Sequence, residues 1–191
     1  MFGLTASGKA TLAKALGERF GLHVVHPSGI MRDLMEGGAA DASQTRANDG
    51  YWETPEGARR LSERTVHEVP VDVATTQVLL REIDRGEVVI DTWSLPWLTP
   101  YGFKVHLLAA PEERVRRAAL RANSPEEVVR QRVESKDRQT QELFKRLYGF
   151  DIFTDFEDRF HLTVETDGLS AKLVEERTSA AFDRYCQALT R

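Results

Sequence analysis

The sequence predicts an α/β fold of three layers, in which a parallel sheet is flanked by helices. Short apolar runs typical of strands alternate along the 191 residues with amphipathic segments typical of helices. A glycine-rich loop precedes the first amphipathic segment. Residues 87–91 form an apolar run that ends in an acid, Asp91. Because open parallel sheets bind ligands at the carboxyl ends of their strands, Asp91 is a candidate ligand-binding residue.

The glycine-rich loop has the spacing of a phosphate-binding P-loop, with Gly3, Gly8 and Lys9 at the expected positions. In such loops glycines let backbone amides turn toward phosphate oxygens, and the lysine reaches the outer phosphates. The helix that follows ends at Gly21, and its N-terminus favours an anion. An ordinary glycine turn before a helix is the alternative. We predict a nucleoside triphosphate site formed by Gly3, Ala6, Ser7, Gly8, Lys9, Ala10 and Thr11.

Two features of this loop are unusual. Ala10 stands where a Ser or Thr hydroxyl normally ligates Mg²⁺, so we expect magnesium to be held through phosphates and waters, without a set of protein ligands. Only Met1 and Phe2 precede the loop, so the first strand is expected to be truncated. Lys9 is expected to face solvent until a nucleotide binds.

Composition predicts one globular domain. Hydrophobic residues make up 41% and charged residues 29% of the chain, and the net charge of −4 argues against nucleic-acid binding. No signal peptide and no apolar run of about 18 residues is present, so we expect no membrane partner. The single Cys186 fits a cytoplasmic protein, and a monomer is expected. The basic excess within residues 112–138 is either a solvated helix face or a polyphosphate-binding surface.

The order of elements follows from periodicity and from turn residues. Strands are expected at 23–26, 87–91, 104–109 and 161–165. Helices are expected from the glycine loop to Phe20 and at 30–35, 55–68, 71–84 and 112–122, then as two helices between Ser124 and Tyr148, and finally along the stripe from Leu173 to Leu189. Ser124 is expected to cap the first of those two helices. Residues 36–58 read as a long loop in which Tyr51 and Trp52 form an anchor.

Three motifs together resemble those of the cytidylate kinases, in particular the archaeal-type branch of the nucleoside monophosphate kinases. They are the glycine loop, the segment Ser28-Gly29-Ile30-Met31-Arg32, and the segment from Lys145 to Ile152 that contains Tyr148-Gly149. The resemblance covers about residues 3–166. It implies one P-loop kinase-like domain over residues 1–191, with an acceptor-binding helical insertion at about 27–84 and a helical lid at about 121–149.

The resemblance also implies an activity, which is transfer of the γ-phosphoryl group of ATP to a nucleoside monophosphate, with CMP or dCMP as the favoured acceptor. It implies that Lys9 holds the outer phosphates and that lid cations close over the transferred group. The implied lid cations are Arg132, Lys136 and Arg138, with Arg121 as a weaker candidate. The implied acceptor-binding residues are Ser28, Arg32, Asp72 and Asp91, the last of which orients a magnesium-bound water.

The chain departs from that family pattern at several positions. The family usually carries an arginine after the third strand, where this chain has Trp93, and its lid Arg-Glu pair is here Lys136-Asp137. Trp93 and Trp97 are interpreted as core-filling residues, with stacking on a base as the alternative for Trp93. Two other hypotheses therefore stay open, namely a catalytically impaired ATP-binding or regulatory protein and a truncated form of an active kinase.

Overall fold

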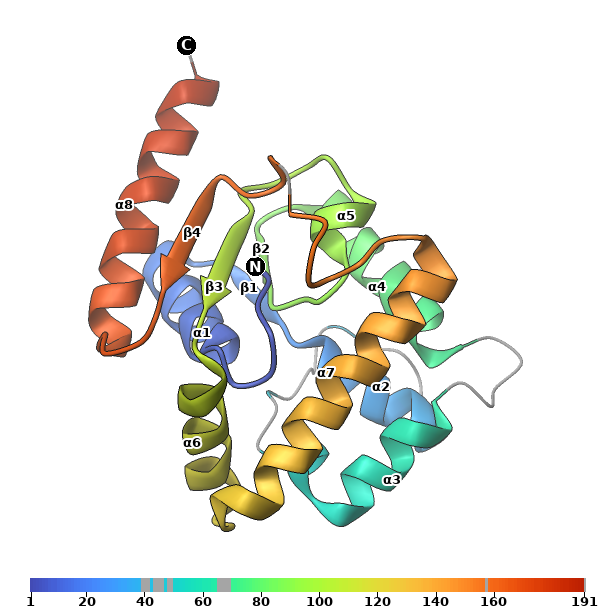
Figure 1. The fold of residues 1–191 in the computed structure, drawn as a ribbon. Helices are drawn as coiled ribbons and strands as arrows, with labels where there is room; N and C mark the ends of the chain where they lie inside the picture. The colour runs from blue at the N-terminus through green and yellow to red at the C-terminus, as the bar shows by residue number, and fades with distance from the viewer. Residues whose placement is uncertain (39–41, 43–46, 48–49, 65–69, 157, 191) are drawn as a thin grey trace.

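The computed structural model describes residues 1–38, 42, 47, 50–64, 70–156 and 158–190 (Figure 1). Its strands are β1 (His23–Val25), β2 (Val88–Ile90), β3 (Val105–Leu108) and β4 (Leu162–Glu165). Its helices are α1 (Lys9–Phe20), α2 (Pro27–Met35), the short 3₁₀ helix η2 (Tyr51–Glu53), α3 (Pro55–Glu63), α4 (Val71–Arg85), α5 (Leu95–Leu98), α6 (Pro111–Ala122), α7 (Glu126–Tyr148) and α8 (Ala171–Leu189). All four expected strands are confirmed, each somewhat shorter than predicted.

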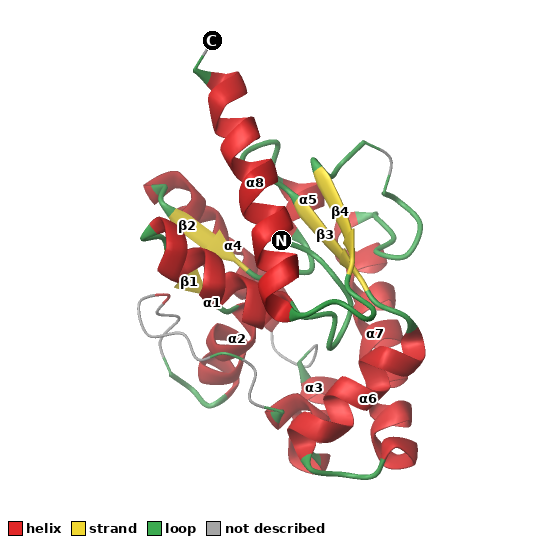
Figure 2. Cartoon of the chain, turned by 90° about the vertical axis from the view of Figure 1, so that its left-hand side faces the viewer, coloured by secondary structure: helices red, strands yellow, loops and turns green. Residues whose placement is uncertain are grey.

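The sheet consists of two parallel strand pairs joined by Met1 and Phe2. β1 pairs with β2, and β3 pairs with β4. The Met1 amino nitrogen donates to the Ile90 carbonyl at 2.7 Å, and the Phe2 amide donates to the Val105 carbonyl at 2.7 Å. Figure 2 shows the N-terminus between the two pairs. The predicted first strand is therefore reduced to a single bridge at Phe2, which occupies the centre of the sheet.

Helices cover both faces of this sheet and form the predicted three layers. α1 and α8 bury one face in a cluster that contains Leu12, Leu107 and Val174. α4 and α5 bury the other face through Leu79 and Leu95. Because alternate strand residues point to opposite faces, the neighbours Val89 and Ile90 belong to different clusters.

An aromatic cluster surrounds Phe2, which is fully buried. Its ring contacts Trp97 edge-on at 4.9 Å between centroids and stacks on Phe160 at 5.7 Å. The interpretation of Trp97 as a core-filling residue is therefore confirmed. His106 packs against the same rings, and burial lowers the pKa of its imidazole to about 4, so this strand residue is neutral at pH 7.

Several helix boundaries differ from the prediction. α2 begins at Pro27 because proline suits the first turn of a helix, where its missing N–H is not needed. The two helices expected after Ser124 are one continuous helix, α7, because residues 126–148 contain neither glycine nor proline. Ser124 does not cap it, since its hydroxyl donates to the Ala122 carbonyl at 3.1 Å.

The segment expected to be a long loop contains η2 and the start of α3, and the anchoring role of Trp52 is confirmed because it is only 3% exposed. The remainder of the predictions for residues 39–41, 43–46, 48–49 and 65–68 lies outside the described residues. Among the described residues, no helix is long and apolar enough to cross a membrane. Cys186 is exposed on α8.

We expect Phe2→Ala to destabilise the protein by about 3–5 kcal/mol, because it removes a fully buried ring from the centre of the sheet and leaves a cavity. Urea denaturation followed by circular dichroism measures this loss. Leu189→Ala is the control, because Leu189 is exposed and its truncation should change stability by less than about 0.5 kcal/mol. Equal stability of the two variants would contradict a structural role for the Phe2 ring.

Candidate active site

The glycine loop adopts a conformation that its small residues permit. Gly8 has φ of 102° and Ala6 has φ of 62°, both in the left-handed region. A Cβ atom on Gly3 would lie 2.3 Å from the Ser7 Oγ atom and 2.7 Å from the Leu107 carbonyl oxygen. Gly3 therefore lets the loop pass close to the end of β3 before it enters α1.

Lys9 is folded back onto its own loop. It is 8% exposed, and its Nζ atom donates to the Gly3 carbonyl at 2.7 Å and to the Leu4 carbonyl at 3.1 Å. The same nitrogen lies 5.5 Å from the centre of the Trp93 ring. Desolvation lowers the pKa of Lys9 to about 8, although the negative charge of Asp91 opposes this shift. The expectation of a solvent-facing lysine is wrong, because the loop carbonyls and Trp93 enclose the ammonium group.

A buried carboxylate ties the loop to α7. Asp137 accepts a hydrogen bond from the Thr5 hydroxyl at 2.7 Å and one from the Thr5 amide at 3.3 Å. Arg114 of α6 pairs with the other Asp137 oxygen and also donates to the Thr5 carbonyl at 3.2 Å. Asp137, which resembles the acid of a lid Arg-Glu pair, thus holds the phosphate loop against the α6–α7 hairpin.

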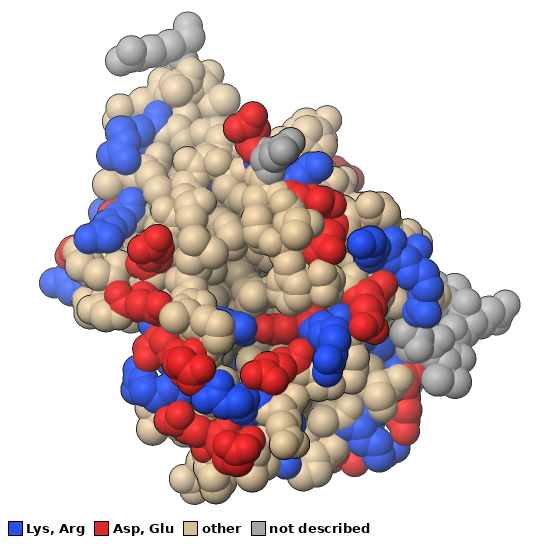
Figure 3. Space-filling view, in the orientation of Figure 1, with Lys and Arg blue, Asp and Glu red and all other residues tan. Residues whose placement is uncertain are grey.

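A cavity of about 290 Å³ opens in front of the loop. Its walls include the loop residues Thr5 to Thr11, together with Ser28, Asp91, Trp93, Arg117, Arg121 and Lys136. The structure therefore places four of the predicted site residues, Lys9, Asp91, Ser28 and Lys136, around one cavity. Asp91 is oriented by His26, whose Nδ1 atom lies 3.1 Å from a carboxylate oxygen. In the space-filling view charges of both signs are interspersed over the lower half of the molecule (Figure 3). We call the cavity in front of the glycine loop the phosphate cavity.

A second cavity of about 90 Å³ shares four wall residues with the first, namely Ser28, Asp91, Trp93 and Lys136. We call it the acceptor cavity. Its apolar wall residues are Met31, Trp52, Leu61, Leu79 and Phe144. Trp93 thus lines both spaces, so core filling alone does not describe its position.

Polar groups at the end of the acceptor cavity are incompletely paired. Asp72 is 7% exposed, and one of its carboxylate oxygens lies 3.5 Å from an Arg64 nitrogen. Among the described residues, the other Asp72 oxygen and the Thr75 hydroxyl have no hydrogen-bond partner. Burial raises the pKa of Asp72, although Arg64 opposes this shift. Buried polar atoms without partners are costly, so this end of the cavity suits a polar ligand.

A third cavity of about 230 Å³ lies on the other side of the loop and shares Ser7, Gly8, Thr11 and Arg117 with the phosphate cavity. Leu12, Leu169 and Val174 supply apolar wall. The Arg117 guanidinium donates to the side-chain and backbone oxygens of Thr166, both at 2.9 Å. The sequence analysis did not identify this space.

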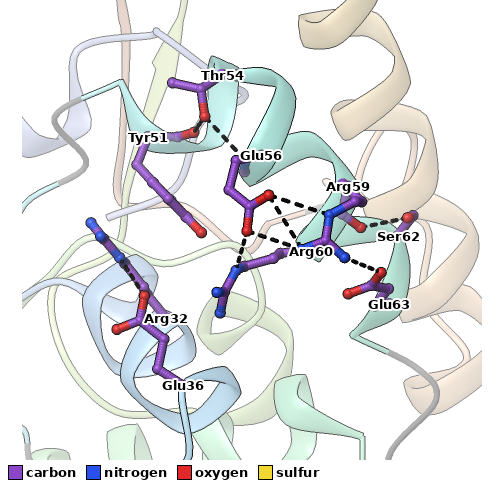
Figure 4. Close-up of polar contacts among 10 residues, drawn as sticks. Arg32, Glu36, Tyr51, Thr54, Glu56, Arg59, Arg60, Ser62 and Glu63 are labelled. Carbon is purple, nitrogen blue, oxygen red and sulfur yellow. Dashed lines mark hydrogen bonds and ion pairs between the residues drawn. The ribbon is translucent and has the colours of Figure 1, made fainter.

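Four predicted site residues, namely Gly3, Arg32, Arg132 and Arg138, do not line the phosphate or acceptor cavity. Arg32 lies 4.0 Å from the Tyr51 ring centre and donates to Glu36 at 3.1 Å (Figure 4). Arg132 donates to the backbone carbonyl of Glu53 at 2.6 Å. Arg138 is exposed on α7 and lines neither of these two cavities.

Three site residues escaped the sequence analysis. Arg64 and Glu53 gave no sequence signal, because each acquires its role only when η2 and α3 pack beside α7. Arg117 belonged to the basic segment at 112–138, and α6 places it at the phosphate cavity. The basic composition of that segment therefore indicated a phosphate-binding surface, but it did not distinguish Arg117 from the other cations.

The arrangement defines a P-loop kinase fold. The structure resembles a crystal structure of an uncharacterized protein from Eubacterium ventriosum, with a TM-score of 0.63, 10% identity and 96% coverage of both chains. It also resembles shikimate kinase from Acinetobacter baumannii in complex with shikimate, with a TM-score of 0.53, 16% identity and coverage of 96% of this chain and 91% of that one.

The sequence matches the model of the cytidylate kinase-like family over residues 2–168, and the chain belongs to that family. It is 29% identical over 176 residues to a cytidylate kinase of Ignicoccus hospitalis, covering 91% of this chain and 92% of that protein. It is 34% identical over 175 residues to a cytidylate kinase of Aeropyrum pernix, covering 89% and 90% respectively. The family resemblance inferred from the three motifs is confirmed, and the chain is a nucleoside monophosphate kinase by class.

We expect Asp137→Asn to lower the free energy of unfolding by about 3 kcal/mol, because it leaves the buried Arg114 charge without its counter-ion. Urea denaturation measures the loss. Glu134→Gln, at an exposed position of the same helix, should leave stability within about 0.5 kcal/mol. A loss no larger than that of the control would show that the loop is held by other contacts.

We also expect ATP affinity to fall as pH rises above about 8. Lys9 loses its proton through its lowered pKa of about 8, whereas phosphates favour the charged ammonium, so binding takes up a proton above that pH. One linked proton limits the fall to about tenfold per pH unit. Calorimetric titration from pH 7 to pH 9.5 measures it. Lys14→Met, on the exposed side of α1, should keep the full pH dependence, and Lys9→Met should abolish it.

Proposed function

We propose that this chain transfers the γ-phosphoryl group of ATP to CMP or dCMP. One observation carries the proposal: the phosphate cavity and the acceptor cavity meet at Ser28, Asp91, Trp93 and Lys136. A donor in one space and an acceptor in the other would have their phosphates at that junction. The third cavity, beside Arg117, is a suitable space for the adenosine part of ATP.

The proposed reaction needs no covalent enzyme intermediate. An oxygen of the acceptor phosphate attacks the γ-phosphorus, the bond from that phosphorus to the β-γ bridging oxygen breaks, and ADP leaves. Catalysis then consists of alignment, charge stabilisation and exclusion of water. Lys9 would leave the Gly3 and Leu4 carbonyls to hold the outer phosphates, and Arg121 and Lys136 would stabilise the transferred group.

The residues around the phosphate cavity fit Mg²⁺ held mainly by ATP oxygens and waters. Ala10 offers no ligand, while Asp91 and Thr11 line the cavity and supply oxygen atoms. Among the described residues, no group of three or more His, Cys, Asp or Glu side chains gathers as a metal site. When bound, the ion would neutralise phosphate charge. Asp91, oriented by His26, would then position a magnesium-bound water.

The polar end of the acceptor cavity supports cytosine as the base. Cytosine presents an amino group as donor beside ring acceptors. The unpaired Asp72 oxygen would accept from that amino group, and Arg64 would donate to the acceptors. Uracil would instead turn a carbonyl oxygen toward the Asp72 carboxylate, and these two acceptor groups repel each other. The small size of the cavity also favours a pyrimidine over a purine.

Other parts of the prediction stay within this proposal. Arg32 would bind the acceptor phosphate only after leaving Glu36 and Tyr51, and Arg132 and Arg138 would act only after their side chains turn toward the phosphate cavity. The division into an acceptor-binding insertion at 27–84 and a lid at 121–149 belongs here too. A monomeric state, a cytoplasmic location, and the absence of nucleic-acid and membrane partners are also part of this proposal.

We expect Asp72→Asn to change acceptor choice in a coupled ADP-release assay with ATP and CMP, dCMP, UMP or AMP. The wild type should prefer CMP and dCMP. The side-chain amide introduced by the substitution can donate to the uracil carbonyl, so the kcat/KM ratio of CMP to UMP should fall by about 10-fold or more. Asp84→Asn, at an exposed position of α4, should keep the wild-type ratio. Wild-type turnover without a CMP preference would contradict the acceptor assignment.

A second candidate function is ATP binding without efficient transfer, as in a sensor or regulatory protein. Two observations favour it, namely the retention of Lys9 by its own loop carbonyls and the lack of a hydroxyl at Ala10. Calorimetry that shows magnesium-dependent ATP binding, together with no ADP release across the four monophosphates, would select this function over the kinase.

A further inference from the structure

Glu53 is a buried acid on which three cations of the α6–α7 hairpin converge. The side chain is only 1% exposed. Its Oε1 atom lies 2.9 Å from an Arg121 nitrogen and 3.6 Å from the Lys136 Nζ atom. Arg132 reaches the same residue through its backbone carbonyl. Two of these cations, Arg121 and Lys136, also line the phosphate cavity.

Local structure fixes the position of Glu53. It ends η2, and the next residue, Thr54, caps α3 by accepting from the Gly57 amide at 3.0 Å while donating to the Tyr51 carbonyl at 2.7 Å. A Cβ atom at Gly57 would lie 2.0 Å from that Tyr51 oxygen, so only glycine allows this close approach. The turn is thus held firmly against the start of α3.

The electrostatic setting explains why an acid is needed there. Arg121 and Lys136 come from different helices and repel each other, and both lie near enough to Lys9 to lower the pKa of that residue. Because a buried cation is costly without a counter-ion, a carboxylate that contacts both stabilises their approach to one site. Glu53 itself lines neither the phosphate cavity nor the acceptor cavity, so its charge acts from behind the two cations.

We infer that Glu53 is a positioning residue that holds Arg121 and Lys136 at the phosphate cavity, so that these cations are oriented before the nucleotide binds. The inference rests on the proposed phosphotransfer. The short helix η2 thus sets the orientation of cations on α6 and α7 through the Glu53 side chain. The interaction is a fixed ion pair, and phosphates add to it without replacing it.

Glu53→Gln tests this role, because it keeps the size of the side chain and removes its charge. We expect kcat to fall about 10- to 100-fold, since the cations lose their orientation. KM for ATP should stay within about threefold or decrease, because the glycine loop is intact and the cavity has lost a nearby negative charge. In a Lys136→Met background, Glu53→Gln should have much less effect than in the wild type, because it acts through Lys136.

Two controls separate positioning from folding. Glu56→Gln removes an acid close by in the sequence that is exposed and pairs only with Arg59 and Arg60 among the interactions drawn in Figure 4, so kcat should be unchanged. Phe182→Leu removes a ring of α8 that packs against Phe20 and Phe103, away from Glu53 and the phosphate cavity, so it reports what a loss of thermal stability alone does to kcat. If Glu53→Gln does not fold, Glu53→Asp is the substitute variant. It keeps the negative charge on a side chain that is shorter by one methylene, so it should fold and should lower only kcat.

The outcomes distinguish the inference from the proposed function. A wild-type chain that binds ATP without turnover would overturn the proposed function and the inference with it. An active wild type whose kcat is unaffected by Glu53→Gln would overturn the inference alone. So would a fall in kcat that Phe182→Leu reproduces at equal melting temperature, or a rise in KM for ATP without a fall in kcat.

Discussion

The backbone hydrogen bonds of Met1 and Phe2 join two pairs of strands into one sheet. The Ile90 and Val105 carbonyls accept from these two residues, so β2 and β3 are held on either side of them. The glycine loop leaves the sheet directly from this point, and Asp91 follows β2 at the same edge. The phosphate cavity therefore depends on a two-residue segment whose side-chain contribution is the buried Phe2 ring.

Two buried carboxylates then fix what surrounds the loop. Asp137 connects α7 to Thr5, and Glu53 connects η2 to cations on α6 and α7. Both acids face the inner side of the α6–α7 hairpin, which also has a small apolar core of its own. A buried acid stabilises only when its partners are correctly placed, so these pairs specify one position of the hairpin more than they add to stability. The described structure thus combines a rigid loop with pre-oriented cations.

Local chemistry explains which parts of this arrangement were predictable. The glycine loop, the four strands and the final helix follow from spacing and periodicity within short windows, and all of them are present. The two helices expected between Ser124 and Tyr148 are the single helix α7, because the run behind Pro125 contains no glycine or proline to end the first of them. Arg64 and Glu53 were invisible for a different reason. Asp72, the partner of Arg64, lies on α4, and Arg121, a partner of Glu53, lies on α6, so only packing brings each pair together.

The exchange of arginine for Trp93 has a physical counterpart elsewhere in the site. A tryptophan after β2 cannot pair with phosphate, but its ring faces the Lys9 ammonium and lines both cavities. A cation at the junction of donor and acceptor is still required by the charge that develops during transfer. Lys136 lines that same junction from α7, and Glu53 contacts it there. In the proposed reaction Lys136, with Glu53 behind it, would supply positive charge at this junction, where Trp93 supplies none.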